Sequence, residues 1–182
     1  MSSIMSPPTY TVSWVVSSSA APVELVCTRS WSPLGSDRFY SLLQAGYYTE
    51  NVAFFRVVPN FIIQFGITGN VTKNKLWDTT IKDDPTGVKS NTKGTLTFAT
   101  AGPDTRTTQL FVNLVDNARL DDQGFTPLCE VREGMQALER YEFCVGPAVA
   151  DETKGGPPSN SPSLPPRASS VSQTQPPTTA TA

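Results

Sequence analysis

The chain has 182 residues, of which 38% are hydrophobic, 9% aromatic and 16% charged, and its formal net charge is −2. These proportions fit one globular domain with a less ordered extension, and they exclude a collagen, a coiled coil or a wholly disordered chain. The sequence contains no histidine, which excludes histidine general acid/base catalysis, Ser-His-Asp and Cys-His nucleophile systems, and histidine-ligated metals.

The predicted elements, taken in chain order, begin with strands. Residues 1–8 are expected to form a disordered N-terminus. Runs rich in β-branched and aromatic residues at 9–16 and 23–27 flank a small polar stretch and predict a hairpin. A helix is predicted to begin near Pro33 and to end at Gly46, where glycine supplies the C-cap conformation. Its expected apolar face consists of Leu34, Phe39, Leu42 and Leu43.

The middle of the chain predicts more strands and a second helix. The strands are expected at residues 54–58, 61–65, 94–98 and 109–113. The helix is expected over residues 133–141, with Met135, Leu138 and Tyr141 facing inward. Short strands separated by turn residues are typical of an all-β sandwich or barrel. We therefore expect one folded domain over residues 9–145.

The composition changes after residue 145. Residues 146–182 contain no aromatic residue, few large aliphatic residues and half of the 16 prolines. Such a segment cannot bury enough apolar surface to offset its loss of backbone entropy, so a disordered tail is predicted. Residues 162–167 have the PxxP form of a ligand for polyproline grooves, but proline-rich tails often contain this form by chance.

Charge, hydropathy and cysteine usage limit the expected partners and compartment. A near-neutral chain has no concentrated basic surface, so neither nucleic acid nor a membrane is an expected partner. No apolar stretch approaches the roughly 20 residues that a membrane helix needs, and no secretory signal is visible. Cys27, Cys129 and Cys144 are irregularly spaced and indicate neither a metal site nor a disulfide framework. We expect a reducing, cytoplasmic environment and a monomer.

Arg56 is the charged residue whose surroundings are most informative. It lies in an apolar run that extends from Phe54 to Gln64. On a regular strand its side chain would share one face with Phe54 and Val58. An arginine in this position is often only a strand-edge side chain, with its stem on apolar neighbours and its head in water.

Several blocks of sequence together resemble the cyclophilin family of peptidyl-prolyl cis-trans isomerases. These blocks are residues 32–40, 45–48, 54–66, 94–113 and 120–135, in matching order and spacing. The resemblance implies a mostly β fold, an eight-stranded antiparallel barrel capped by two helices, with its active site in an outer groove. It also implies an isomerase that accelerates X-Pro bond rotation in proline-containing polypeptides, assists folding and needs no metal or cofactor.

The resemblance assigns roles to individual positions. Arg56 is similar to the family's catalytic arginine, and Gln64 to the glutamine that holds this arginine and the substrate backbone. The implied walls of the proline pocket are Phe61, Ile62, Phe111 and Leu120. The implied shelf for the neighbouring substrate residues consists of Ala99, Thr100, Ala101 and Gln109.

Three departures from the family pattern lead to further predictions. Arg119 stands where many members have a tryptophan that contacts cyclosporin, so weak cyclosporin binding is predicted. Gly124 and Phe125 occupy the region of a frequent groove histidine, and Phe125 is predicted to close the pocket. No strand-like run follows Val145 to complete the barrel, so an unpaired sheet edge and low stability are predicted.

Two other functions stay open at this point. The chain could be a proline-peptide binding module with negligible turnover, because its groove rim is altered. It could also be an interaction protein that captures partners through residues 146–182.

Overall fold

The computed structural model describes residues 4–16, 21–49, 52–145, 170–173 and 178–179. The predicted first hairpin is present. Strands β1 (Thr9–Val16) and β2 (Val23–Thr28) are antiparallel, with Thr9 opposite Thr28 and Trp14 opposite Val23. Alternate side chains of β1 are buried, as the twofold period of a strand requires for a sheet with one face on the core.

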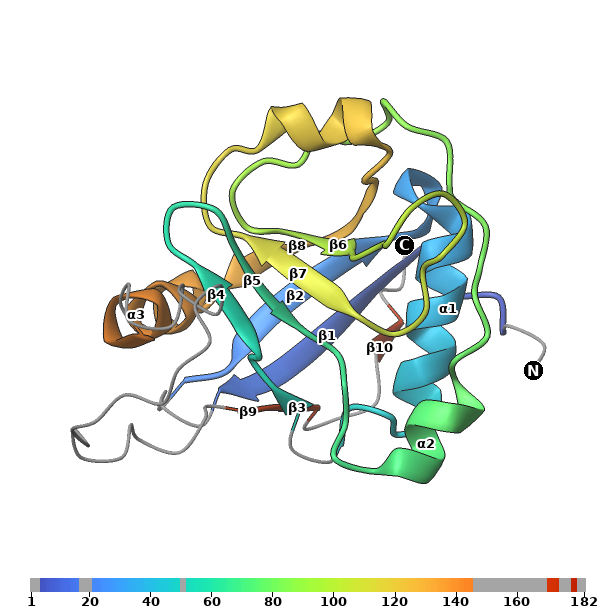
Figure 1. Cartoon of the computed structure of the whole chain (residues 1–182), viewed down its shortest axis with the longest axis horizontal. Coiled ribbons are helices and arrows are strands. Elements are labelled where there is room, and N and C mark those ends of the chain that lie inside the picture. The colour runs from blue at the N-terminus through green and yellow to red at the C-terminus, as the bar shows by residue number, and fades with distance from the viewer. Residues whose placement is uncertain (1–3, 17–20, 50–51, 146–169, 174–177, 180–182) are drawn as a thin grey trace, which may run out of the picture.

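The strands form one antiparallel sheet (Figure 1). Its remaining strands are β3 (Val52–Ala53), β4 (Arg56–Val58), β5 (Ile62–Phe65), β6 (Thr95–Phe98), β7 (Leu110–Asn113), β8 (Pro127–Glu133), β9 (Ser170–Gln173) and β10 (Thr178–Thr179). Their order is β3-β9-β1-β2-β8-β6-β7-β5-β4, and β10 pairs with β1. Only Phe54 and Phe55 separate β3 from β4, so both ends of the sheet lie in one short segment, as a barrel requires. The mostly β, antiparallel fold class is therefore confirmed.

The predicted strand over residues 54–58 is interrupted. Phe54 leaves the strand and is buried in the core, where its ring lies 5.7 Å from that of Phe65. Arg56 is exposed at the start of β4. The expectation that Arg56 shares a face with Phe54 is therefore wrong, because the chain bends between them to place the phenyl ring inside.

The first predicted helix is confirmed as α1 (Pro33–Gln44), which is followed by Gly46 with a φ of +61°. Its N-terminal amides are satisfied by a distant carboxylate, since Leu34 N and Gly35 N each donate to Asp84 at 2.8 Å. Phe39, Leu42 and Leu43 are buried as expected, but Leu34 is 45% exposed. Leu34 lies in the first turn, away from the sheet-facing stripe.

The second predicted helix is α3 (Met135–Val145), which begins two residues later than expected. Glu133 still belongs to β8, where it pairs with Glu24, and Gly134 turns the chain with a φ of +83°. Leu138 is buried and Met135 packs against the core, as predicted, whereas the Tyr141 side chain lies outside the described residues. Figure 1 places α1 and α3 on opposite sides of the sheet.

Strands β3, β8, β9 and β10 and two helical segments longer than one turn were not predicted. The segments are α2 (Val71–Leu76), which Asn70 caps by accepting from Lys73 N, and the 3-10 helix η2 (Ala118–Gln123). A short 3-10 turn, η1 (Arg29–Trp31), precedes α1. No helix in the described part of the chain is long and apolar enough to cross a bilayer.

The segments expected to lie outside the domain contribute to it. Strand β9 pairs with β1 and β3, with Val171 opposite both Val16 and Val52. The expectation that no strand follows residue 145 is therefore wrong. Ser6 is also buried, and its backbone N donates to Asp37 Oδ1 at 2.9 Å. The PxxP run at 162–167 and the rest of residues 146–169 lie outside the described residues.

Cys27 and Cys129 form a disulfide, which corrects the expectation of unpaired cysteines. The two residues face each other in the register of β2 and β8, although 102 positions separate them in the sequence. The pairing of these cysteines depends on β8, a strand that the sequence did not predict.

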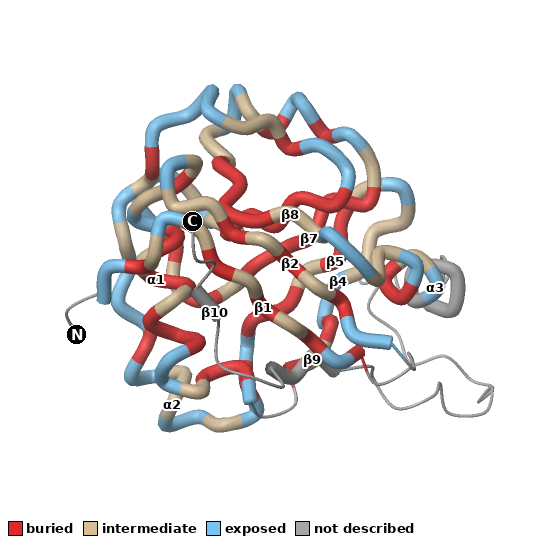
Figure 2. The backbone as a smooth tube through the Cα atoms, turned by 180° about the vertical axis from the view of Figure 1, so that it is seen from behind, coloured by how far each residue is buried: buried red, intermediate tan, exposed pale blue. Residues whose placement is uncertain are grey.

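The buried residues form two separate apolar clusters. The larger one fills the space enclosed by the sheet, α1 and α3, and Figure 2 shows buried residues alternating with less buried ones along β1. The smaller one consists of Ile62, Phe111 and Leu120, with Phe61, Ala99 and Phe125 packed against it. The smaller cluster lies on the outer face of the sheet and is where the candidate site lies.

Candidate functional site

Strands β5 and β7 supply the centre of the site through simple alternation. Ile63 and Phe65 point into the main core, whereas Ile62 and Gln64 point to the other face. On β7, Leu110 and Val112 are core residues, whereas Phe111 faces outward beside Gln64. Successive side chains of a strand lie on opposite faces, so the same strands build the core and the site.

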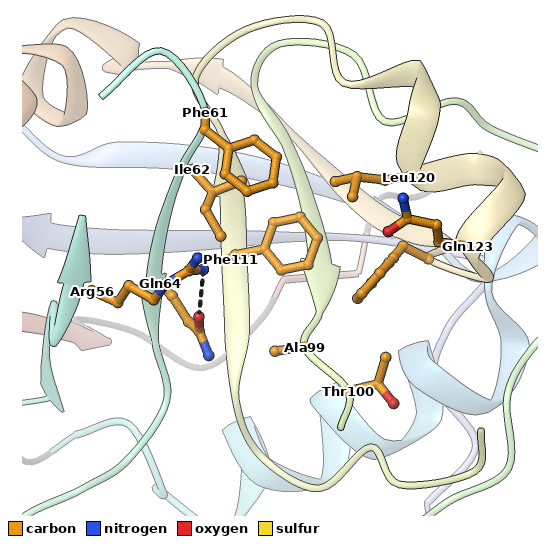
Figure 3. A pocket seen from close by; sticks show the side chains of 10 residues that line it. Arg56, Phe61, Ile62, Gln64, Ala99, Thr100, Phe111, Leu120 and Gln123 are labelled. Carbon is orange, nitrogen blue, oxygen red and sulfur yellow. Dashed lines mark hydrogen bonds between the residues drawn. The ribbon is translucent and has the colours of Figure 1, made fainter. Parts of the chain in front are cut away.

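The small cluster lines an open pocket of about 210 Å³ (Figure 3). Arg56 and Gln64 lie on one side of it, Leu120 and Gln123 on the other, and Phe111 between them. The full lining is Arg56, Phe61, Ile62, Gln64, Ala99, Thr100, Phe111, Leu120, Gln123 and Phe125. An apolar concavity with a few polar groups at its rim is the usual form of a small-ligand site.

Arg56 and Gln64 are direct partners across β4 and β5. The Arg56 Nη1 donates to Gln64 Oε1 at 3.3 Å, which Figure 3 marks, and Gln64 Nε2 donates to Gln109 Oε1 at 3.0 Å. The arginine is exposed, and no carboxylate among the described residues forms an ion pair with it. Its positive charge is therefore held at the pocket edge by neutral amides and remains free to act on a bound ligand.

A second pocket of about 260 Å³ continues from the first. It shares Gln64, Ala99 and Thr100 with the first pocket, and it adds Ala101, Thr105, Thr107 and Gln109. Its lining has small, uncharged and partly hydroxylated side chains. The two pockets together form a groove long enough for more than one residue of a peptide, and every residue of the implied shelf lies in it.

Phe125 lines the first pocket and packs against the small cluster. Its ring meets the ring of Phe111 edge-on, with centroids 5.6 Å apart. Gly124 precedes it with a φ of +88° and ends η2, so the chain reverses and brings Phe125 back toward Leu120, whose carbonyl accepts from Phe125 N at 3.2 Å. An aromatic pair of this geometry adds stability beyond its buried area.

A buried polar network supports the pocket walls from behind. Asn113 Nδ2 donates to Thr95 Oγ1 at 2.9 Å, and Asn117 Nδ2 donates both to Asn113 Oδ1 at 2.8 Å and to the Phe61 carbonyl at 3.0 Å. Asn91 Nδ2 donates at 2.7 Å to the Phe125 carbonyl and to Asp121 Oδ1. These bonds connect the two aromatic walls, Phe61 and Phe125, to the sheet.

Asp121 holds η2 in this network as a carboxylate. Burial raises its pKa, but hydrogen bonds from Ser90 and Asn91 outweigh this effect and leave the pKa below the ordinary value. Asp121 therefore accepts these bonds in its charged form at neutral pH, which keeps η2 and Leu120 in place.

Two residues at the pocket were not in the set carried over by resemblance. Gln123 lines the pocket from the last turn of η2. Arg119, considered above only for cyclosporin, stacks on the Phe61 ring with its Cζ 4.7 Å from the ring centroid. Neither contact could be inferred from the sequence, because it depends on where the 3-10 helix η2 is packed.

The charge at this site comes from Arg56. Arg56 is the only ionisable residue that lines either pocket within the described residues. No group of side chains suited to hold a metal ion occurs in the part of the chain that the structure describes. The site can therefore bind a compact apolar group and hold the positive charge of Arg56 beside it.

Comparison with known proteins agrees with this geometry. Residues 16–155 match the family model described as cyclophilin type peptidyl-prolyl cis-trans isomerase/CLD. A peptidyl-prolyl cis-trans isomerase of Acinetobacter baylyi is 32% identical over 123 residues, which cover 65% of each chain. Peptidyl-prolyl cis-trans isomerase-like 3 of Dictyostelium discoideum is 32% identical over 66% of this chain and 74% of its own length.

Structural comparison supports the fold. A crystal structure of a cyclophilin-type peptidyl-prolyl cis-trans isomerase from Cryptosporidium parvum has a TM-score of 0.66. The match covers 92% of this chain and 98% of the other at 19% sequence identity. At that identity the likeness concerns the fold alone.

Proposed function

Because the chain belongs to the cyclophilin-type peptidyl-prolyl cis-trans isomerase family, we propose that it accelerates rotation about X-Pro bonds in polypeptides at the groove described above. The observation that carries this proposal is the juxtaposition of the Arg56 guanidinium with the apolar pocket lined by Ile62, Phe111 and Leu120. Proline-containing polypeptides are the proposed substrates, and assistance to folding is the proposed role.

The barrier to this reaction is electronic. Rotation breaks the resonance of the amide and costs about 18–20 kcal/mol, so uncatalysed exchange takes tens of seconds or longer. No covalent bond forms or breaks. A catalyst needs only to stabilise the twisted state, in which the proline nitrogen regains a lone pair.

Arg56 is suited to stabilise that state. A guanidinium remains positively charged at all physiological pH values and offers several N–H donors in a rigid fork. A guanidinium directed at the proline nitrogen stabilises the twisted amide more than either planar state. The barrier to rotation is lower for that reason. Gln64 acts as a positioning residue, since it accepts from Arg56 and is itself held by Gln109.

The pocket supplies the binding energy. Phe61, Ile62, Phe111, Leu120 and Phe125 would enclose the pyrrolidine ring, and burial of apolar surface there is worth about 25 cal/mol per Å². The residues on one side of proline would lie along the second pocket, on Ala99, Thr100, Ala101 and Gln109. The ring is then fixed while the acyl side rotates.

The decisive test is the isomerisation rate of Arg56→Ala on an Ala-Pro peptide, followed by NMR exchange or a protease-coupled assay. We expect kcat/KM to fall by two to three orders of magnitude, about 3–4 kcal/mol of barrier. The melting temperature should stay unchanged, because the Arg56 side chain is exposed and its guanidinium bonds to the Gln64 side chain at the pocket edge. Arg56→Lys is the matched variant, which keeps the charge but loses the fork and should recover only part of the rate.

The same assay decides between the enzyme and the alternative of a binding module. If the wild type binds the peptide with no faster exchange, the groove serves recognition only. If Arg56→Ala exchanges as fast as the wild type, the arginine is a surface residue and the proposed mechanism is wrong. The tail alternative is tested by removing residues 146–169, which precede β9, so that the strand itself is kept. Loss of partner capture with peptide binding by the groove intact would favour that alternative.

Weak binding of cyclosporin remains part of the proposal. A guanidinium at Arg119 offers a different shape and hydrogen-bonding pattern from an indole, and it already stacks on Phe61. Arg119→Trp should strengthen cyclosporin binding in a calorimetric titration. An unchanged affinity would show that Arg119 is not the cause of weak cyclosporin binding.

A further inference from the structure

Arg119 is a second positive charge at the rim of the proline pocket, and the proposed mechanism does not use it. It is exposed on η2, directly before the pocket residue Leu120. Its guanidinium Cζ lies 4.7 Å from the centroid of Phe61, which lines the same pocket. The guanidinium therefore lies against the pocket wall while the residue stays exposed.

The fold holds this contact in place from both sides. The carbonyl of Phe61 accepts from Leu114 N at 2.9 Å and from Asn117 Nδ2 at 3.0 Å. Asn117 is the N-cap residue of η2, so the backbone that carries Arg119 is tied to the backbone that carries Phe61. Part of the cost of orienting a long side chain is therefore met before any ligand binds.

The charge of Arg119 is not neutralised within the described residues. Asp122 follows at i+3, where side chains of a 3-10 helix eclipse, but it forms no ion pair with Arg119. Asp121 is occupied by Ser90 and Asn91. Arg119 therefore keeps its full capacity to bind a carboxylate, and the planar fork of a guanidinium matches one.

The rest of the groove makes this charge selective. The second pocket is lined by uncharged residues, and Arg56 is assigned to the proline nitrogen. Phe61 lines the first pocket but not the second, so Arg119 lies beyond the proline on the side away from the second pocket. A substrate side chain that extends past Phe61 meets Arg119 first.

We propose that Arg119 is a specificity-determining residue that favours proline peptides with an acidic side chain next to the proline. This inference rests on the proposed function, because it assigns a substrate class to the same groove. The expected gain is modest, since exposed ion pairs are weak. We expect the acidic peptide to exceed its neutral counterpart in kcat/KM by about three- to fivefold at low salt.

The test compares Glu and Gln peptides, which differ in charge but hardly in shape. Two pairs are used, one with the variable residue directly before proline and one with it directly after. In the wild type, the Glu/Gln ratio of kcat/KM should be about three to five for one of the two positions and should fall toward one at high salt. In Arg119→Gln, that ratio should fall to about one.

A matched control removes the same charge elsewhere. Arg140 is exposed on α3, far from η2 in Figure 1, and Arg140→Gln should leave the ratio at its wild-type value. If Arg119→Gln keeps the wild-type ratio, Arg119 does not select the substrate and the inference is wrong. A ratio of about one at both positions in the wild type overturns it equally.

The peptides also separate this inference from the proposed function. Failure of the wild type to accelerate any of the four peptides contradicts the proposed isomerase activity. In that case the dissociation constants of the same peptides, measured by NMR titration, take the place of kcat/KM. A Glu/Gln affinity ratio that is lost in Arg119→Gln still supports selection by Arg119, and an equal affinity refutes it.

Discussion

The two apolar clusters of this molecule use the same strands for opposite purposes. Ile63 is fully buried in the main core, and its neighbour Ile62 on β5 lies in the small cluster that lines the open pocket. Leu110 and Phe111 repeat this division on β7. The core is closed and supports the fold, whereas the small cluster leaves an unfilled space on the outside that is available to a ligand.

The difference between the clusters explains how the pocket keeps its shape although no side chain fills it. The core holds the strands, and the strands hold the pocket residues on their outer face. The bulky apolar walls Phe61, Leu120 and Phe125 lie outside the strands. Phe61 and Phe125 are held through their carbonyls by Asn117 and Asn91, and Leu120 lies in η2. Stability and function are therefore carried by different side chains at adjacent positions, and substitutions can separate them.

The largest stability effect is expected for Ile63→Ala, compared with Ile62→Ala. The first opens a cavity in the closed core and should lower the free energy of unfolding by about 3–5 kcal/mol. The second enlarges a pocket that is already open, so it should cost about 1–2 kcal/mol but reduce kcat/KM roughly tenfold. Urea unfolding and the exchange assay measure the two effects. Equal stability losses with equal rates would show that the clusters are not functionally distinct.

The next largest effect is expected from the disulfide, which belongs to the core side of the comparison. Cys27 and Cys129 close a loop with a sequence separation of 102 residues, and removal of such a crosslink typically costs about 2–4 kcal/mol. Reductant should lower the unfolding midpoint of the wild type and leave kcat/KM unchanged at low temperature. The double variant Cys27→Ala/Cys129→Ala should not respond to reductant. An identical midpoint for the wild type with and without reductant would contradict the crosslink.

A smaller effect is expected for Asn113→Ala, which acts on the boundary between the clusters. Asn113 is fully buried and bonds to Thr95 and Asn117, so its removal leaves buried polar groups unpaired and should cost about 1–3 kcal/mol. It should also lower kcat/KM severalfold, because Asn117 then holds Phe61 less firmly. Asn74→Ala is the control, since Asn74 bonds to Thr68 and Tyr47 at α2, away from the pocket. Loss of activity in both variants would indicate general destabilisation.

The smallest effect is the response to pH. Burial raises the pKa of Asp37, but hydrogen bonds from Arg29 and Ser6 outweigh it and leave the pKa below its ordinary value. The pKa of Asp121 at the pocket is lowered in the same way. The stabilisation from each is complete above the ordinary aspartate pKa of about 3.9 and is lost as the pH falls through the lower folded value. In Asp121→Asn, the loss of unfolding free energy at low pH should keep the contribution of Asp37 and lack that of Asp121.

Between about pH 5 and 9, kcat/KM should be flat, because arginine is the only ionisable side chain lining the described pockets and remains charged there. A bell-shaped profile near neutrality would show that another titrating group takes part.

Much of this molecule follows from local sequence. Pro33 and Gly46 set the ends of α1, and the strand predicted at residues 61–65 contains β5. The absence of histidine excludes histidine-based acid/base catalysis and histidine-ligated metals. These signals are readable because helix caps and strand alternation depend on residues only a few positions apart.

What the sequence did not determine depends on contacts between distant segments. Strand β8 begins with a proline and contains three charged residues, so its sequence is a weak strand signal. Its pairing with β2 and β6 defines the strand and also places Cys129 opposite Cys27. Strand β9 comes from a polar segment, and its place in the sheet depends on its pairing with β1 and β3. The position of Arg119 on Phe61 depends on how η2 packs across the sheet. In each case, the favourable free energy comes from partners far apart in the chain, and tertiary packing alone decides which partners meet.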